Sequence, residues 1–167
     1  MHHGVTLRLT QFAVQRVGII AFLHQLVSYF LRFFAGTAEA LTDSEFAAIY
    51  KEAQKYVGTP YVWGGSTPET GFDCSGYVCW VYNQNGYNVG RTTANGLWNK
   101  CQHISEAEAK PGDLVFFKGT YDTPGMSHTG IYLGNGMMVS AGDPIKYANI
   151  HSSYWQKYLS GFGRLSK

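Results

Sequence analysis

The segment Gly71 to Trp80, GFDCSGYVCW, contains two cysteines five positions apart, Cys74 and Cys79. Two thiols at this spacing could form a disulfide, share a metal ion, or act separately as a nucleophile and a packing residue. On a helix they would point roughly 140° apart, so a disulfide would require the helix to break. A metal site needs further cysteine or histidine ligands at short spacing, and the neighbouring sequence offers none. We therefore expect the two thiols to serve different purposes.

Cys74 has the surroundings expected of a reactive thiol. It follows a glycine-rich loop and Asp73, precedes Ser75, and falls in the first turn of an expected helix. Free backbone N–H groups and the positive end of the helix dipole favour a thiolate there, which predicts a lowered pKa. Cys79 is interpreted as a small buried residue and Cys101 as structurally incidental. Three cysteines also exclude a dense disulfide framework.

A thiolate nucleophile needs a base, and His128 is the candidate in this sequence. It opens a strand expected in the segment MSHTGIYLG, from which its side chain can project toward a helix end. The combination of Cys74 at a helix start with a histidine on a strand indicates a site for acyl transfer. His103 and His151 are interpreted as surface residues.

The composition limits the classes of partner. The 167 residues suffice for one ordinary domain. Lysine and arginine number 13 and the acidic residues 11, and no basic cluster occurs, which argues against nucleic acid as a partner. Charged residues make up 14% of the chain and aromatic residues 16%, a balance that suits an uncharged polymer or a peptide as ligand.

An apolar run at residues 17–36, VGIIAFLHQLVSYFLRFFAG, differs from the rest of the chain. Arg8 and Arg16 precede it and small residues follow it, as in an export signal. Its polar residues make it a poor membrane span, and its apolar positions recur at helical spacing. Residues 1–40 are therefore interpreted as a signal or membrane-contacting anchor, as an amphipathic packing helix, or as a segment added for expression. The domain is expected to occupy residues 41–167.

Two helices are expected at the start of this domain. Thr42 or Asp43 can cap the first, whose apolar face continues to Val57 before Gly58 and Pro60 end it. The second helix starts in the DCSG segment, and a short helical or irregular stretch, RTTANGLWNKC, follows it.

Strands are expected in the second half of the domain. The Asn135–Gly136 pair is a strong hairpin signal between two of them. Helices first and antiparallel strands second indicate an α+β fold. The strand candidates are LVFFK (114–118), SHTGIYLGNG (127–136), MMVSA (137–141), IKYANIH (145–151) and LSGFGRL (159–165).

Five motifs occur in order: PYVWGG, DCSG, KPGDLVFF, SHTGIYLGNG and YANIHSSYW. Together they resemble the NlpC/P60 family of papain-like cell-wall cysteine peptidases. The resemblance covers residues 43–166 and is strongest to the peptidase domain of wall hydrolases from Gram-positive conjugative elements. It implies an α+β papain-like fold in which N-terminal helices pack on an antiparallel sheet.

The resemblance also implies an activity, cleavage of peptidoglycan stem peptides between γ-linked D-glutamate and a diamino acid. In this reading Cys74 is the nucleophile, His128 is the general base, and the Tyr61 hydroxyl lies near the oxyanion. Asp73 and Ser75 match positions that hold the free amino end of the stem peptide. Asp73 is also a candidate helix N-cap, and the two roles can coexist.

One position departs from the family pattern. The family usually places His, Asn or Gln on the strand after the base to orient the imidazole, and Ser140 stands there in this chain. A serine can accept the ring N–H, directly or through water, but its reach is short. A weakened triad would leave a wall-binding domain, and an amidase or acyltransferase on the same scaffold is a further alternative.

The remaining expectations concern ligands and location. Of the four tryptophans, Trp63 is the strongest candidate for contact with substrate. Neither a metal nor a cofactor is expected. The partner expected is the peptidoglycan stem peptide, bound by a monomer outside the cell or in the wall of a Gram-positive bacterium. Residues 17–36 are a candidate for membrane contact.

Overall fold

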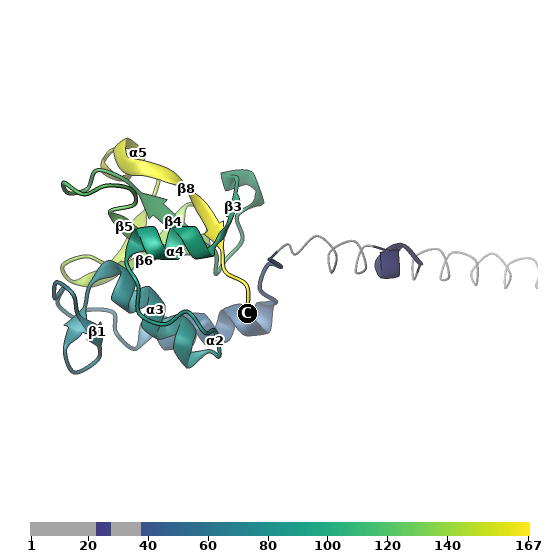
Figure 1. Cartoon of the computed structure of the whole chain (residues 1–167), viewed down its shortest axis with the longest axis horizontal. Coiled ribbons are helices and arrows are strands. Elements are labelled where there is room, and N and C mark those ends of the chain that lie inside the picture. The colour runs from purple at the N-terminus through teal and green to yellow at the C-terminus, as the bar shows by residue number, and fades with distance from the viewer. Residues whose placement is uncertain (1–22, 28–37) are drawn as a thin grey trace, which may run out of the picture. The chain divides into compact units, whose positions relative to one another are not determined.

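The computed structural model describes residues 23–27 and 38–167, and residues 38–167 form one unit (Figure 1). Residues 23–27 are helical, whereas the rest of the apolar segment 17–36, with the helix expected there, lies outside the described residues. Within the described part of the chain, none of the helices combines the length and the apolar character that spanning a membrane requires.

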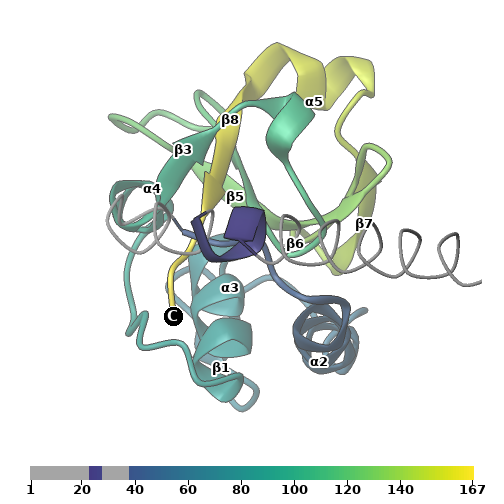
Figure 2. The same cartoon turned by 90° about the vertical axis from the view of Figure 1, so that its right-hand side faces the viewer.

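Helix α2 (Asp43–Gln54) opens the unit as the sequence predicts. The Thr42 hydroxyl accepts the Glu45 backbone N–H at 3.3 Å, and the Glu45 carboxylate accepts the Thr42 backbone N–H at 3.0 Å. These reciprocal bonds satisfy N–H groups that a helix start leaves free. Ile49 and Ala53 form the buried face of the helix, which lies beside α3 on the same side of the sheet (Figures 1 and 2).

Helix α3 (Cys74–Gln84) is the central element of the unit. Asp73 caps it by accepting the Gly76 backbone N–H at 2.6 Å. A Cβ at Gly76 would lie 2.1 Å from the backbone oxygen of Gly65, so glycine is required where the helix meets the preceding loop. Strands β1 (Ser66–Thr67) and β2 (Gly71–Phe72) form a small hairpin in that loop. Helix α4 (Ala94–Lys100) follows α3.

A six-stranded antiparallel sheet fills the second half, in the order β3-β8-β4-β5-β6-β7. The hairpin predicted at Asn135–Gly136 joins β5 to β6, with both residues at positive φ. The sequence did not predict β3, the 3-10 turn η1 (Glu106–Glu108) or helix α5 (Ser153–Tyr158). The strands are β3 (Gln102–Ile104), β4 (Leu114–Phe117), β5 (His128–Gly134), β6 (Met137–Ala141), β7 (Ile145–Asn149) and β8 (Leu159–Arg164).

Both faces of the sheet are covered, which explains why β4 is buried throughout. Leu114 and Phe116 belong to the larger core between the sheet and the helices α2, α3 and α4. Val115 and Phe117 belong to a smaller core on the other face, where Trp155 of α5 packs. The α+β class and the packing of helices on an antiparallel sheet are thereby confirmed.

A buried ion pair joins β8 to the turn before β4. Arg164 donates from Nε and Nη2 to the two carboxylate oxygens of Asp113, each at 2.8 Å, and also to the Glu108 backbone oxygen. Asp113 is 2% exposed and accepts the Lys110 backbone N–H as well. Loss of the arginine would therefore leave a buried carboxylate without its counter-charge.

We expect Arg164→Met to lower the free energy of unfolding by about 3–5 kcal/mol, because an unpaired buried charge is costly. The free energy of unfolding is measured by urea unfolding followed by circular dichroism. The matched control is Lys167→Met, which removes an exposed pair with Glu45 and should have a much smaller effect on the free energy of unfolding. Equal losses in the two variants would contradict the structural role given to Arg164.

Candidate active site

A pocket of about 520 Å³ opens where the N-terminus of α3 meets the start of β5 and the β6–β7 turn. It brings together Tyr61, Cys74 and His128, which the sequence analysis had named from separate motifs. The described residues that line it are Tyr61, Cys74, Thr120, Tyr121, Ser127, His128, Ala141, Gly142, Asp143, Lys146, Tyr154 and Trp155.

The Cys74 thiol is buried at the base of this pocket. The residue is 6% exposed, and Sγ lies 4.0 Å from the backbone oxygen of Ser127. Burial raises the pKa of the thiol to about 11, with a contribution from the negative charge of Asp73. Backbone N–H groups, including that of Thr129, favour the thiolate without reversing the effect. The lowered pKa expected from the helix start is therefore wrong for this structure, since desolvation outweighs the helix terminus.

His128 is the first residue of β5, as the sequence predicted, and is 9% exposed. Its ring stacks on Trp155 with centroids 5.0 Å apart and lies 5.8 Å from Phe117. Burial lowers its pKa to about 4, although the charge of Asp73 opposes the shift. Nε2 is buried and has no hydrogen-bond partner among the described residues. At neutral pH the ring is therefore neutral and keeps a free nitrogen.

Tyr61 lines the same pocket from the loop before β1. A bridge to Phe72 fixes its backbone, and its N–H donates to the Asp143 carboxylate at 3.4 Å. Burial, and then the nearby Cys74, raise the pKa of the phenol. The hydroxyl consequently remains protonated over the physiological pH range and available as a hydrogen-bond donor.

Ser140 is buried on β6, next to the strand that carries His128. Ile131 pairs with Val139, so the following position along β6 sets Ser140 beside Gly130, two residues from the histidine. A Cβ at Gly130 would lie 2.9 Å from Cβ of Ser140, so the glycine permits this close approach. In the described structure no hydrogen bond joins Ser140 to His128, and the orienting role of Ser140 stays a prediction.

Asp73 and Ser75 flank Cys74 but do not line the pocket. Arg91 donates from Nη2 to Asp73 at 2.5 Å and from Nη1 to the Ser75 hydroxyl at 3.0 Å. The Ser75 hydroxyl in turn donates to Asp73 at 2.9 Å. The interpretation of Asp73 as a helix cap is confirmed, and its carboxylate is also paired with a cation that the sequence analysis missed. Only the tertiary fold brings Arg91 here, so no local pattern could have identified it.

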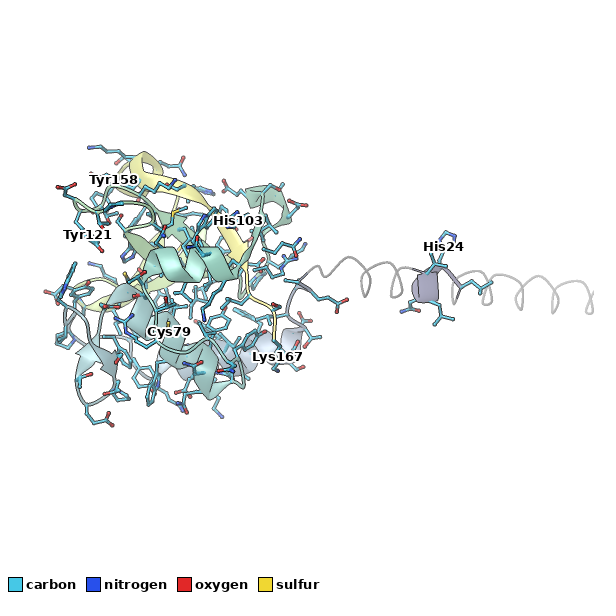
Figure 3. All side chains as sticks on the ribbon, viewed as in Figure 1. His24, Cys79, His103, Tyr121, Tyr158 and Lys167 are labelled. Carbon is cyan, nitrogen blue, oxygen red and sulfur yellow. The ribbon has the colours of Figure 1, made fainter. Side chains whose placement is uncertain are left out.

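Exposed aromatic rings border the pocket. Trp63 is 71% exposed and does not line the pocket itself, but its ring meets that of Tyr121 edge-on at 5.2 Å. Tyr121 does line the pocket, as does Tyr154, which packs edge-on against Trp155 at 5.0 Å. Figure 3 shows Tyr121 at the edge of the domain, whereas Cys79 lies inside it.

Cys79, Cys101, His103 and His151 do not line the pocket. All three cysteines are free thiols, and Cys79 is 2% exposed in the main core, as predicted. His103 stacks on Trp98 at 3.6 Å, and His151 pairs with Glu106 at 2.7 Å on the surface. The described residues contain no group of three or more His, Cys, Asp or Glu able to hold a metal ion.

Several pocket residues carry no local signal in the sequence because their contacts are tertiary. Trp155 ends the motif YANIHSSYW, but nothing in the sequence sets it against His128, and it is the ring that covers the imidazole. Asp143 lies in the turn between β6 and β7, Lys146 lies on β7, and Tyr121 comes from a loop with no regular pattern. A thiol, a neutral base and a phenol around one cavity suit nucleophilic attack on a carbonyl.

Comparison with known proteins places this arrangement in a family. The model of the NlpC/P60 family matches residues 58–164. The chain is 49% identical over 121 residues to the bifunctional muramidase/DL-endopeptidase CwlT of Bacillus subtilis (strain 168), covering 72% of this chain and 36% of that protein. It is 36% identical over 157 residues to the gamma-DL-glutamyl hydrolase of the same organism, covering 91% of this chain and 38% of that protein.

Solved structures agree with these relatives. One crystal structure comes from Staphylococcus aureus subsp. aureus Mu50 and is described as similar to lipoprotein, NLP/P60 family. It aligns with this chain with a TM-score of 0.75 and 41% sequence identity. The alignment covers 78% of this chain and 44% of that one. The chain thus spans little more than a third of the two curated relatives and under half of this structural neighbour.

Alkylation of Cys74 should follow the raised pKa of its thiol. Because only the thiolate reacts, the rate with iodoacetamide should rise about tenfold per pH unit from pH 7 to 10, without a plateau near neutrality. The rate is measured by mass spectrometry in a Cys79→Ser, Cys101→Ser background. A plateau below pH 8 would show that the helix terminus dominates after all.

Arg91 should make the Cys74 thiol easier to ionise, because it offsets the negative charge of Asp73. We expect Arg91→Met to slow alkylation at pH 9 by roughly threefold to tenfold, corresponding to a further rise of the thiol pKa. Arg91→Lys, which keeps the charge, is the matched control and should remain near the wild-type rate. Identical pH profiles for the wild type and Arg91→Met would contradict this role.

Proposed function

The chain belongs to the NlpC/P60 family, and from that premise we propose that it is a cysteine endopeptidase of the bacterial cell wall. Its substrate is the peptidoglycan stem peptide, cut between γ-linked D-glutamate and the diamino acid. The observation that carries the proposal is the shared pocket of Cys74, His128 and Tyr61. The names of the two Bacillus subtilis relatives, a DL-endopeptidase and a gamma-DL-glutamyl hydrolase, support the choice of bond.

The proposed reaction starts from a neutral thiol and a neutral imidazole, as the two pKa shifts require. His128 takes the thiol proton as Cys74 Sγ attacks the peptide carbonyl carbon. The resulting oxyanion accepts hydrogen bonds from the Tyr61 hydroxyl and the Cys74 backbone N–H. The imidazolium then protonates the leaving amine as the C–N bond breaks. Water, deprotonated by His128, hydrolyses the thioester and restores the thiol.

Binding of the stem peptide involves the rim as well as the pocket. Trp63 and Tyr121 offer exposed rings against which a peptide can pack. Asp73 and Ser75 remain proposed partners of the free amino end. An ammonium group would have to compete there with Arg91, which holds both side chains in the described structure. Recognition of the amino end therefore depends on Arg91 giving up part of its contact.

A second candidate function is wall binding with weak or absent catalysis. The observation that favours it is Ser140, which occupies the position of the orienting residue without a hydrogen bond to His128 in the described structure. Either function would act outside the cell, in a Gram-positive wall, and the muramidase/DL-endopeptidase name of the Bacillus subtilis relative supports this location. An assay of stem-peptide cleavage distinguishes the two functions.

Digestion of purified muropeptides tests the proposal. The wild type should release products ending in γ-linked D-glutamate, identified by mass spectrometry. Cys74→Ala should abolish cleavage, and His128→Ala should lower kcat by at least about 10²-fold, since general-base catalysis is lost. Cys101→Ser, a thiol outside the pocket, should retain activity. Cleavage by Cys74→Ala, or no cleavage by a correctly folded wild type, would exclude the endopeptidase mechanism.

A further inference from the structure

The pocket is nearly free of charge, and its two charged side chains differ in how they are engaged. Among its described lining residues Lys146 is the one lysine or arginine, and Asp143 is the one acidic residue. Burial keeps His128 neutral at physiological pH. Asp143 accepts the backbone N–H of Tyr61, whereas Lys146 makes no hydrogen bond or ion pair with the described residues. The pocket therefore presents one ammonium group without a partner among the described residues, together with one carboxylate that accepts a backbone N–H.

The fold directs this lysine at the pocket. Lys146 lies on β7, the edge strand of the sheet, and pairs in register with the buried Ser140 of β6. A Cβ at Gly142 would lie 3.9 Å from Cε of Lys146, so the lysine side chain runs beside the Gly142 backbone, which also lines the pocket. The absence of a side chain at Gly142 leaves room for the ammonium group and for a ligand beside it.

We propose that Lys146 binds the free α-carboxylate of the γ-linked D-glutamate, an inference that rests on the proposed function. A γ-peptide bond uses the side-chain carboxyl group of glutamate, so the α-carboxylate remains free and enters the pocket with the scissile carbonyl. A carboxylate that leaves water for a pocket without other cations needs a charged partner. The nearby Arg91 does not supply it, because Asp73 already neutralises that guanidinium.

This assignment makes Lys146 a specificity-determining residue. Amidation of the α-carboxylate gives D-isoglutamine, which has nearly the same shape but no charge. The lysine should therefore favour peptides with the free acid over their amidated counterparts. A charge-assisted hydrogen bond is strong enough to shift the preference by about tenfold or more.

Isothermal titration of the full chain carrying Cys74→Ala, which cannot turn over a peptide, tests this inference. The two probes are L-Ala-γ-D-Glu and its α-carboxamide. With Lys146 intact, the acid should bind about tenfold or more tightly than the amide. Lys146→Met should abolish the preference and Lys146→Glu should reverse it. Lys51→Met, an exposed lysine on α2 away from the pocket, should keep the full preference.

Thermal unfolding verifies that each variant is folded before titration. Failure of the acid to bind, equal affinity for the two probes with Lys146 intact, or a preference that survives Lys146→Met would each overturn the inference. Cleavage of the matching tripeptides by the chain with Cys74 tests the endopeptidase function separately. An acid preference that depends on Lys146, without any cleavage, would support the carboxylate site and exclude the proposed reaction.

Discussion

Desolvation of the Cys74 thiol against the start of β5 is the constraint on which the rest of the site depends. Cys74 Sγ lies 4.0 Å from the backbone oxygen of Ser127, and Trp155 covers the imidazole of His128, which lines the same pocket. Burial disfavours charge on both groups, so the pair rests as thiol and imidazole instead of thiolate and imidazolium. In the proposed reaction, proton transfer must then accompany attack on the substrate, and the neutral imidazole of His128 would receive the proton.

The surrounding elements hold this arrangement by specific contacts. Asp73 fixes the first turn of α3 through the Gly76 N–H, and Arg91 balances the charge that this cap brings close to the thiol. Strand β4 is buried on both faces and pairs with the strand that carries His128. Asp143 ties the loop of Tyr61 to the β6–β7 turn across the pocket. The elements that carry these side chains are thus held in place by two distinct cores and by the contacts of Asp73, Arg91 and Asp143.

Much of the fold could be predicted from the sequence because its signals are local. The capping box at Thr42, the hairpin at Asn135–Gly136 and the start of α3 all depend on neighbouring residues, and the structure contains each of them. Cys74 and His128 were identifiable as candidates for the same reason, since each opens a regular element. The short helix α5 lacked a comparable signal and was missed, although it carries the ring that covers the imidazole.

The features that the sequence predicted wrongly or did not indicate are the pKa of Cys74 and the contacts of Arg91 and Lys146, which depend on the tertiary structure. The pKa of Cys74 depends on how much water the fold removes, and the helix terminus alone gave the wrong direction. Arg91 and Lys146 are ordinary surface-type residues in the sequence, and their importance comes from what the fold places beside them. Residue types therefore predicted Cys74 and His128 as the reacting groups, but they carried no signal for Arg91 beside Asp73 or for Lys146 in the pocket.

The central claim is that Cys74 attacks a carbonyl presented by γ-linked D-glutamate. A substrate mimic, L-Ala-γ-D-glutamyl aldehyde labelled with ¹³C at the aldehyde carbon, tests it most directly by NMR. Addition of the thiol across the C=O bond should produce a hemithioacetal carbon signal in the wild type that is absent in Cys74→Ala. A spectrum showing only free and hydrated aldehyde with the folded wild-type protein would contradict the claim.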